Sequence, residues 1–177
     1  MKKFNLRFLL IAILFFALFT NCSNSNDENS NTNYHLEMKI NGEPRKFNQN
    51  LFFAKNKNPD NSNIEYIGIG GYKGNPNEEG DQFSFEIEYV DNNITIGTYL
   101  QPIANGNPNY DLAANYSNNV TQTYFSSLYL DPQEFKITIT QISDVSIKGT
   151  FSGKMKNEET HEVIEITDGR FMAPIIH

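Results

Sequence analysis

The sequence predicts an all-β fold, a single antiparallel β-sandwich or a partly open barrel, because three features recur along it. Apolar and polar residues alternate with a period of two from residue 34 almost to the end. Turn-forming residues, above all Asn, Asp and Gly, separate these stretches. No window shows the 3.6-residue apolar periodicity of an amphipathic helix. We therefore expect roughly eight to ten short strands around one core.

The N-terminus has the pattern of a bacterial export signal. Three basic residues come first, at Lys2, Lys3 and Arg7. The apolar run Phe8–Phe19 follows, and it is short against the ~20 residues that cross a bilayer. Cys22 lies at the expected cleavage distance, and the segment resembles a lipobox, although Phe19 and Asn21 replace the usual Leu and small residue. We expect lipidation of Cys22; secretion with a free cysteine and an uncleaved anchor are the alternatives.

The stretch after Cys22 predicts a disordered tether, because residues 23–33 contain no apolar side chain to bury. We therefore expect a lipoprotein signal peptide (1–21), a lipidated cysteine with its tether (22–33) and one β-sandwich domain (34–177). Asp27-Glu28 resembles the short acidic signals that follow the lipidated cysteine in surface-exposed lipoproteins of Bacteroidota. This favours display on the surface of the outer membrane over a periplasmic orientation.

Charge and cysteine content narrow the classes of function. The chain has 14 basic and 21 acidic residues, and loss of the signal leaves 11 and 21, a net charge near −10. Such a surface repels nucleic acid and anionic headgroups, so we expect no nucleic-acid partner and membrane contact through the acyl chains alone. Cys22 is the single cysteine, so the domain has no internal disulfide and depends on its hydrophobic core.

The alternation begins with a hairpin over residues 35–47, whose two-residue turn is Asn41-Gly42. A second strand begins at Ile64, with Ile64, Tyr66 and Gly68 on one face. Glycines near its end predict a bulge or a close approach of another backbone. These glycines are Gly68, Gly70 and Gly71.

The clearest strand spans Phe83–Tyr89, with aromatic and apolar residues on one face and Glu86 and Glu88 on the other. Residues 91–93, Asp-Asn-Asn, predict a turn into a strand over 94–98. One face of this pair is apolar and the other charged, which is typical of an antiparallel sheet with one solvated side.

The segment 111–129 is the least regular, and we predict one long loop followed by a strand. Four strands are predicted after it, at 135–140, 147–155, 163–166 and 170–173. Residues 157–160 predict a hairpin turn between the second and third of these strands. Asp168-Gly169 predicts a further turn between the last two.

Three motifs of this half carry a resemblance to a known group of proteins. They are Ile137-Thr138-Ile139-Thr140, Gly149-Thr150-Phe151-Ser152-Gly153 and Ile166–Phe171. Through them the chain is similar to small Bacteroidota lipoprotein families of unknown function, which pair a lipobox with a β-rich domain. The resemblance implies fold and location only. We expect Gly149 and Gly153 to permit close packing against a neighbouring sheet, and Phe151 and Phe171 to fill the core.

No arrangement of reactive side chains predicts an enzyme. The three histidines have no partner at metal-ligand spacing, and His161-Glu162 lacks the second histidine of a zinc-protease motif. The Gly-x-Ser-x-Gly nucleophile elbow is missing. Residues 77–81 and 105–111 place side-chain oxygens at alternate positions, as calcium loops do, but with too few carboxylates. We expect no catalytic residue, no cofactor and no metal.

The candidate binding residues are tyrosines around the least regular segment, where loops usually carry function. They are Tyr99, Tyr110, Tyr116 and Tyr124. With amides such as Gln101 and Asn115 they could form a surface for glycan or peptide recognition, because tyrosine has an apolar body and a polar tip. The absence of tryptophan weakens the sugar interpretation. The alternative is a structural role, packed along the edge of the sandwich.

Two classes of function follow from these observations. The leading hypothesis is a non-catalytic, membrane-anchored lipoprotein that binds a glycan, peptide or protein partner, or contacts other parts of the envelope. The alternative is a lipocalin-like carrier, in which the 14 phenylalanines line a partly empty barrel that holds an apolar ligand. A cavity of several hundred Å³ inside the fold favours the carrier, and a filled interior favours the binding module.

Overall fold

The computed structural model describes residues 33–57, 64–74, 80–90, 94–101 and 110–175. Residues 1–32, with the predicted signal peptide, Cys22 and nearly all of the tether, lie outside the described part, and those predictions stay predictions. The described residues form an all-β domain, a curled antiparallel sheet that makes a half-barrel. This confirms the predicted fold class.

Eleven strands and one 3-10 helix make up the described part of the domain. The strands are β1 (His35–Ile40), β2 (Glu43–Lys46), β3 (Gln49–Lys57), β4 (Ile64–Tyr72), β5 (Gln82–Val90), β6 (Gly97–Leu100), β7 (Tyr110–Asn118), β8 (Thr123–Ser126), β9 (Phe135–Ile142), β10 (Ser146–Lys156) and β11 (Val163–Pro174); the 3-10 helix η1 spans Ser127–Tyr129. No helix in this part of the chain is long and apolar enough to cross a membrane.

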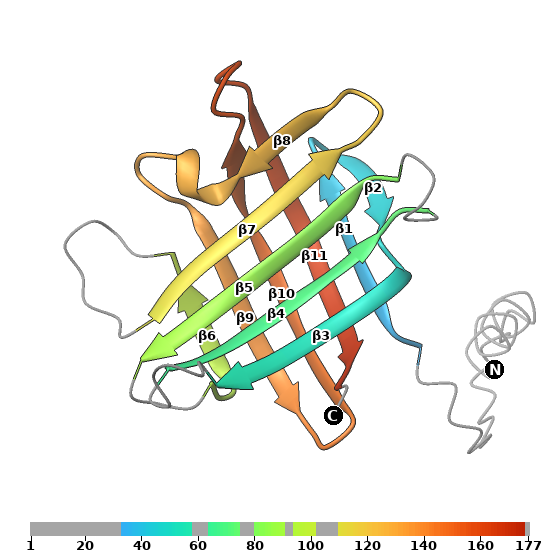
Figure 1. Ribbon diagram of the computed structural model, residues 1–177, viewed down its shortest axis with the longest axis vertical. Helices are drawn as coiled ribbons and strands as arrows, with labels where there is room; N and C mark the ends of the chain where they lie inside the picture. Colours follow the sequence, from blue (N-terminus) through green and yellow to red (C-terminus); the bar gives the residue numbers. More distant parts are fainter. Residues whose placement is uncertain (1–32, 58–63, 75–79, 91–93, 102–109, 176–177) are drawn as a thin grey trace, which may run out of the picture. The chain divides into compact units, whose positions relative to one another are not determined.

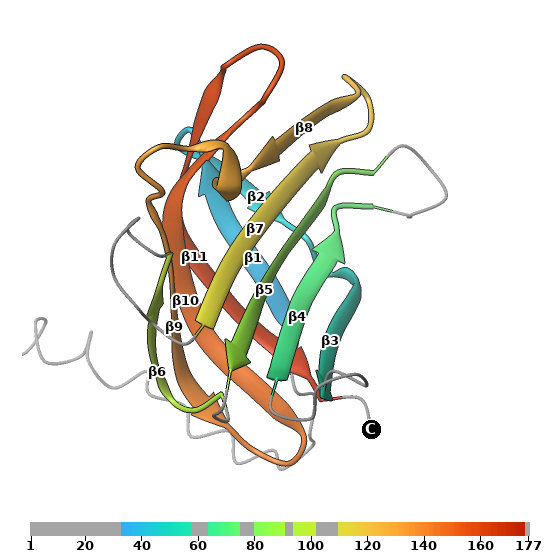
Figure 2. The same cartoon turned by 60° about the vertical axis from the view of Figure 1, so that its left-hand side comes forward.

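The sheet curls so that its strands face each other in two layers (Figure 1). The front layer has the order β8-β7-β5-β4-β3, and the rear layer has the order β6-β9-β10-β11-β1-β2. Figure 2 shows the two layers from the side. They join where Lys156 of β10 pairs with Ser126 of β8. Each layer therefore has one face on the core and one outer face in solvent.

Aromatic rings from both layers fill the space between them. The ring of Phe151 in the rear layer stacks on Phe83 of the front layer at a centroid distance of 5.2 Å and lies 5.4 Å from Phe85. Phe171 lies 5.2 Å from Phe85, and both of these side chains are fully buried. The predicted core positions of Phe151 and Phe171 are confirmed. Their burial contributes the main driving force for joining the layers.

Two of the predicted turns are confirmed. Asn41 and Gly42 both have positive φ, 51° and 83°, as a two-residue hairpin turn requires, and they connect β1 to β2. Asn157 begins the turn between β10 and β11, where its side-chain oxygen accepts the backbone N–H groups of Glu159 and Thr160.

Two strands, β3 and β7, are absent from the sequence prediction, and β6 begins at Gly97 instead of at residue 94. No strand is predicted at β3, although this segment contains the apolar run Leu51-Phe52-Phe53. Residues 111–118 fall in the predicted loop, and together with Tyr110 they form β7. Leu112, Ala114 and Tyr116 alternate inward there, but alanine has a low β propensity and Ala113, on the outer face, is nearly buried as well. Because side chains on both faces of β7 are buried, its sequence lacks the clear alternation of apolar and polar residues that marks a strand with one solvated face.

The predicted turn at Asp168-Gly169 is wrong, because β11 runs without interruption from Val163 to Pro174. The register to both neighbouring strands shifts at this point, and Asp168 has a φ of 53°, so the two residues form a β-bulge. The prediction for Gly149 and Gly153 is also corrected, because the atoms that leave no room for a side chain belong to the same layer and not to the facing layer. At Gly149 they are Thr138 O and the Phe171 ring, and at Gly153 they are Glu134 O and Phe135.

Candidate functional site

The four candidate tyrosines separate into different environments. Tyr99 is 5% exposed and packs edge-on against Tyr89 and Tyr110, with centroid distances of 6.1 and 5.3 Å. The Tyr99 hydroxyl donates to the carbonyl of Thr95 (2.9 Å). The Tyr110 hydroxyl accepts the backbone N–H of Leu100 (2.7 Å), which ties β7 to β6. These rings close the edge of the sandwich between the two layers.

Tyr116 is also part of the core. It is 6% exposed, and its ring lies against Phe125 and Phe47. Its hydroxyl donates to Asp81 Oδ2 (3.1 Å). Burial, followed by the negative charge of Asp81, raises the pKa of this phenol above its ordinary value of 10, so it acts as a hydrogen-bond donor.

Tyr124 differs from the others, because it is 45% exposed on β8. Its hydroxyl donates to Asn115 Oδ1 (2.6 Å), and its ring lies 6.3 Å from that of Tyr129. No ring contact joins Tyr124 to Tyr99, Tyr110 or Tyr116 among the described residues. The tyrosines do not meet in one surface; three of them pack in the fold, and Gln101 is likewise buried.

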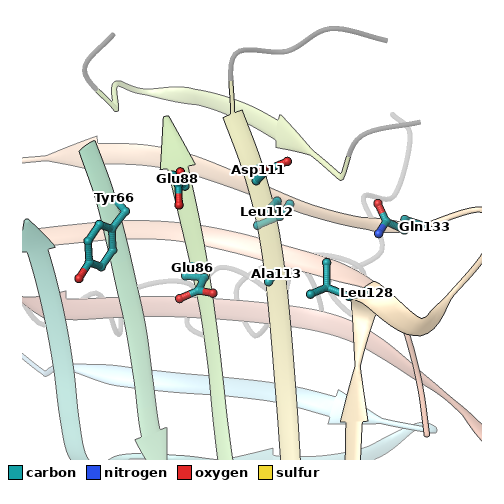
Figure 3. Close-up of a pocket in the computed structure, with 8 residues that line it drawn as sticks. All are labelled: Tyr66, Glu86, Glu88, Asp111, Leu112, Ala113, Leu128 and Gln133. Atoms are coloured by element: carbon teal, nitrogen blue, oxygen red, sulfur yellow. The ribbon is translucent and has the colours of Figure 1, made fainter. Parts of the chain in front are cut away.

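A trough on the outer face of the front layer brings together a different set of residues (Figure 3). Its volume is about 510 Å³. It is lined by Tyr66 of β4, Glu86 and Glu88 of β5, Asp111, Leu112 and Ala113 of β7, Leu128 of η1, and Gln133 between η1 and β9. Strand pairing explains the arrangement, because Tyr66, Glu88 and Asp111 are direct neighbours across three strands.

The floor of the trough is open because two of the three residues in the next cross-strand row are small. Glu86 lies between Gly68 and Ala113 in that row. A Cβ atom added to Gly68 meets no atom within 4 Å, so the space above this glycine is open. The opposite wall is formed by Leu128, which is 52% exposed, and by the amide of Gln133. The trough therefore has an acidic sheet wall and an apolar and amide wall.

The three carboxylates of the trough form no ion pair or hydrogen bond with another described residue. The ion pairs of this part of the chain lie elsewhere. Glu88 and Asp111 also stand directly opposite each other on paired strands. Like charges at directly opposite positions destabilise a sheet. No cation among the described residues offsets this loss of stability.

On the outer face of the rear layer, by contrast, the acidic group is paired with basic side chains. A hollow of about 530 Å³ lies there, lined among others by His35, Glu37, Lys148 and Arg170. Glu37 is bound by Arg170 (2.7 Å) and by Lys46 (3.1 Å), and the hydrogen bond from Arg170 is the main reason that the pKa of Glu37 is lowered. Because the carboxylate at this hollow is already paired with two basic side chains, the trough of the front layer is the stronger candidate site.

The predicted solvent face of Glu86 and Glu88 is confirmed, but the trough is not predictable from the alternation alone. Asp111 and Ala113 were assigned to a loop. Ile64, Tyr66 and Gly68 do share one face of β4, and it is the outer face, because Ile67 and Ile69 point to the core. The period of two in residues 110–118 is the signal that could have identified β7, which is the third strand that lines the trough.

Other predicted features lie at the surface or outside the described part. His161 is an exposed turn residue with a φ of 60°, and its backbone N–H donates to Asn157. Asn105, Asn107 and most of the 77–81 stretch lie outside the described residues. In the described part, no group of three or more His, Cys, Asp or Glu side chains is arranged to hold a metal ion. Comparison with protein-family models, with curated proteins and with solved structures finds no match to this chain.

Proposed function

We propose that this chain is a non-catalytic, lipid-anchored binding module that holds its ligand in the trough on the front layer. The observation that carries the proposal is the charge of the trough: Glu86, Glu88 and Asp111 line a concave surface without a cation from the described chain. A ligand with positive charge or several hydrogen-bond donors supplies what these carboxylates lack.

The anchor and the location belong to the same proposal. Lipidation of Cys22 tethers the domain to the outer membrane through residues 23–33, and Asp27-Glu28 favours the outer surface. A flexible tether of this length spans tens of Å at most, by the about 5–6 Å × √n rule, so the trough works close to the membrane. The domain then needs only its fold and the trough to act as a binding module.

The carrier of an apolar ligand has less support. Phe47, Phe83, Phe85 and Phe171 are fully buried, and ring contacts at 5.2–5.4 Å link Phe83 and Phe85 of the front layer to Phe151 and Phe171 of the rear layer. The trough and the hollow described above both lie on outer faces. A filled interior favours the binding module.

The experiment is a screen of peptide and glycan arrays with the full chain in detergent micelles. The trough variant is Glu86→Gln/Glu88→Gln, and the matched control is Glu158→Gln/Glu159→Gln, which neutralises two exposed glutamates in the turn after β10. We expect array signals that the trough variant loses and the control keeps. Signals that survive equally in both variants, or a blank array, would contradict the proposal.

A further inference from the structure

The trough contains a strand edge that has no partner strand. β8 pairs with β7 only from Asn115 to Asn118 and then leaves the sheet through η1. The backbone N–H of Ala114 is the next group along this edge, and Ser127 Oγ accepts it (2.9 Å). Beyond Ala114 the edge of β7 continues to Tyr110 without a paired strand among the described residues.

The position of this bond fixes the direction of the neighbouring backbone groups. In an antiparallel pair, successive residues point their N–H and C=O groups alternately to one side and to the other. Because Ala114 N–H points away from β5, the N–H and C=O groups of Leu112 do so as well. No described residue bonds to them on that side. Leu112 has a buried side chain, so it lines the trough through its backbone.

A free strand edge beside a groove is the geometry of strand addition, in which an extended segment forms main-chain bonds and places alternate side chains in adjoining pockets. Side chains on one face of such a segment lie on the outer face of the sheet next to Asp111, and Glu88 is one strand further away, within reach of a long basic side chain. The exposed Leu128 on the far wall offers contact to apolar atoms. An extended basic segment matches both walls.

Charge also decides between a second copy of this chain and another protein. The mature chain carries a net charge near −10, and its tether residues Asp27 and Glu28 are acidic, so both are repelled by the trough. We propose that the β7 edge at Tyr110–Ala113 captures an extended basic segment of another protein by strand addition, an inference that rests on the proposed function of the trough.

A peptide with the sequence Trp-Lys-Val-Lys-Val-Lys, blocked at both ends, is a suitable probe. The chain has no tryptophan, so the fluorescence anisotropy of the peptide reports binding to the full chain in detergent micelles without background. Two further peptides carry N-methyl groups, one on the lysine amides and one on the valine amides. A strand offers only one of its edges to β7, so we expect one methylated peptide to bind at least tenfold more weakly while the other stays within threefold.

The charge of the site is tested with Glu88→Lys against the exposed control Glu158→Lys, after thermal melting has shown that both variants fold. We expect at least a tenfold loss of affinity for the probe in Glu88→Lys and less than a twofold change in the control.

Equal affinity of all three peptides would overturn strand addition. Ca²⁺ that displaces the probe more strongly than NaCl of the same ionic strength would assign the trough to a cation instead. If the probe fails while array signals depend on Glu86 and Glu88, this inference fails and the proposed function stands; a blank array removes both.

Discussion

Single phenylalanines carry much of the stability of the core. Phe85 and Phe151 are 1% and 3% exposed and contact rings of the opposite layer. Phe85→Ala or Phe151→Ala should each lower the free energy of unfolding by about 3–5 kcal/mol, because the layers cannot collapse fully into the space that is left. Urea titration measures this. Phe52→Ala, on the edge strand β3, is the control with the smaller expected loss of stability. Equal unfolding free energies for all variants would show that the layers are not packed as described.

The opposed carboxylates of the trough should cost stability. Glu88 faces Asp111 directly across β5 and β7. Glu88→Thr removes the repulsion and adds a β-branched residue to a strand, so we expect the free energy of unfolding to rise by about 0.2–1 kcal/mol while binding in the trough falls. Chemical denaturation at low and high salt tests the cause, since screening should reduce the gain. A variant that is less stable than the parent at low salt argues that Glu88 has a partner.

Glu37 gives the rear layer a pH-dependent contribution. Its pKa lies below the ordinary value of 4.5, chiefly because of the hydrogen bond from Arg170, against the opposing effect of burial. A lowered pKa means that the contribution is complete above about pH 4.5 and disappears as the pH falls through the folded-state value.

We therefore expect Glu37→Gln to cost about 0.5–1 kcal/mol at pH 7, a modest amount because Arg170 and Lys46 are exposed. The difference between parent and variant should shrink toward zero in acid. Unfolding curves between pH 3 and 7 measure it, and a difference that stays constant over that range would contradict the role assigned to Arg170.

At the scale of the strand, the sequence predicted elements well where alternation was uninterrupted. β1, β5, β9 and β10 follow from their period of two, and the Asn41-Gly42 turn follows from its preference for positive φ. β7 could not be recognised in the same way, because Ala113 is nearly buried on the outer face. Asp168-Gly169 has the composition of a turn, but pairing with β1 and β10 keeps the chain extended and turns the extra residue into a bulge.

Two glycines in strands should respond in opposite ways to the same substitution. At Gly68 an added Cβ has open space, so Gly68→Ala should stabilise the domain by about 0.5–1 kcal/mol through the lost flexibility of the unfolded chain. At Gly149 an added Cβ lies 2.6 Å from the Phe171 ring and meets Thr138 O, so Gly149→Ala should destabilise by about 1–3 kcal/mol. Differential scanning calorimetry compares them. The same sign for both would show that close approach does not explain Gly149.

At the scale of the whole molecule, composition and periodicity were enough for the all-β class but not for the site. The trough depends on which strands become neighbours, and the order β7-β5-β4 puts residues 66, 88 and 111 side by side although they are far apart in the chain. Alternation gives the face of each residue without its neighbours across the sheet. The tyrosines lie close together in the sequence but not in one surface, because they belong to β6, β7 and β8 and their hydroxyls bond to different partners.

The proposed anchoring concerns the whole chain and rests on Cys22. Cys22→Ala should abolish incorporation of labelled palmitate and release the domain into the soluble fraction, because no second cysteine is present to be acylated. Ser30→Ala in the tether is the control that should change neither. Protease treatment of intact cells then tests display on the outer surface. Labelling that persists in Cys22→Ala would exclude the lipoprotein assignment.

Binding of a basic segment at the β7 edge is tested most directly by residue-resolved amide hydrogen exchange of the full chain with and without the Trp-Lys-Val-Lys-Val-Lys peptide. The Leu112 amide has no partner among the described residues, whereas the Ala114 amide is already bonded to Ser127. We expect the peptide to slow exchange at Leu112 at least tenfold and to leave Ala114 unchanged. Unchanged exchange at Leu112, with new protection on the rear layer around Thr138 and Thr150, would contradict the assignment of the binding site to the front layer.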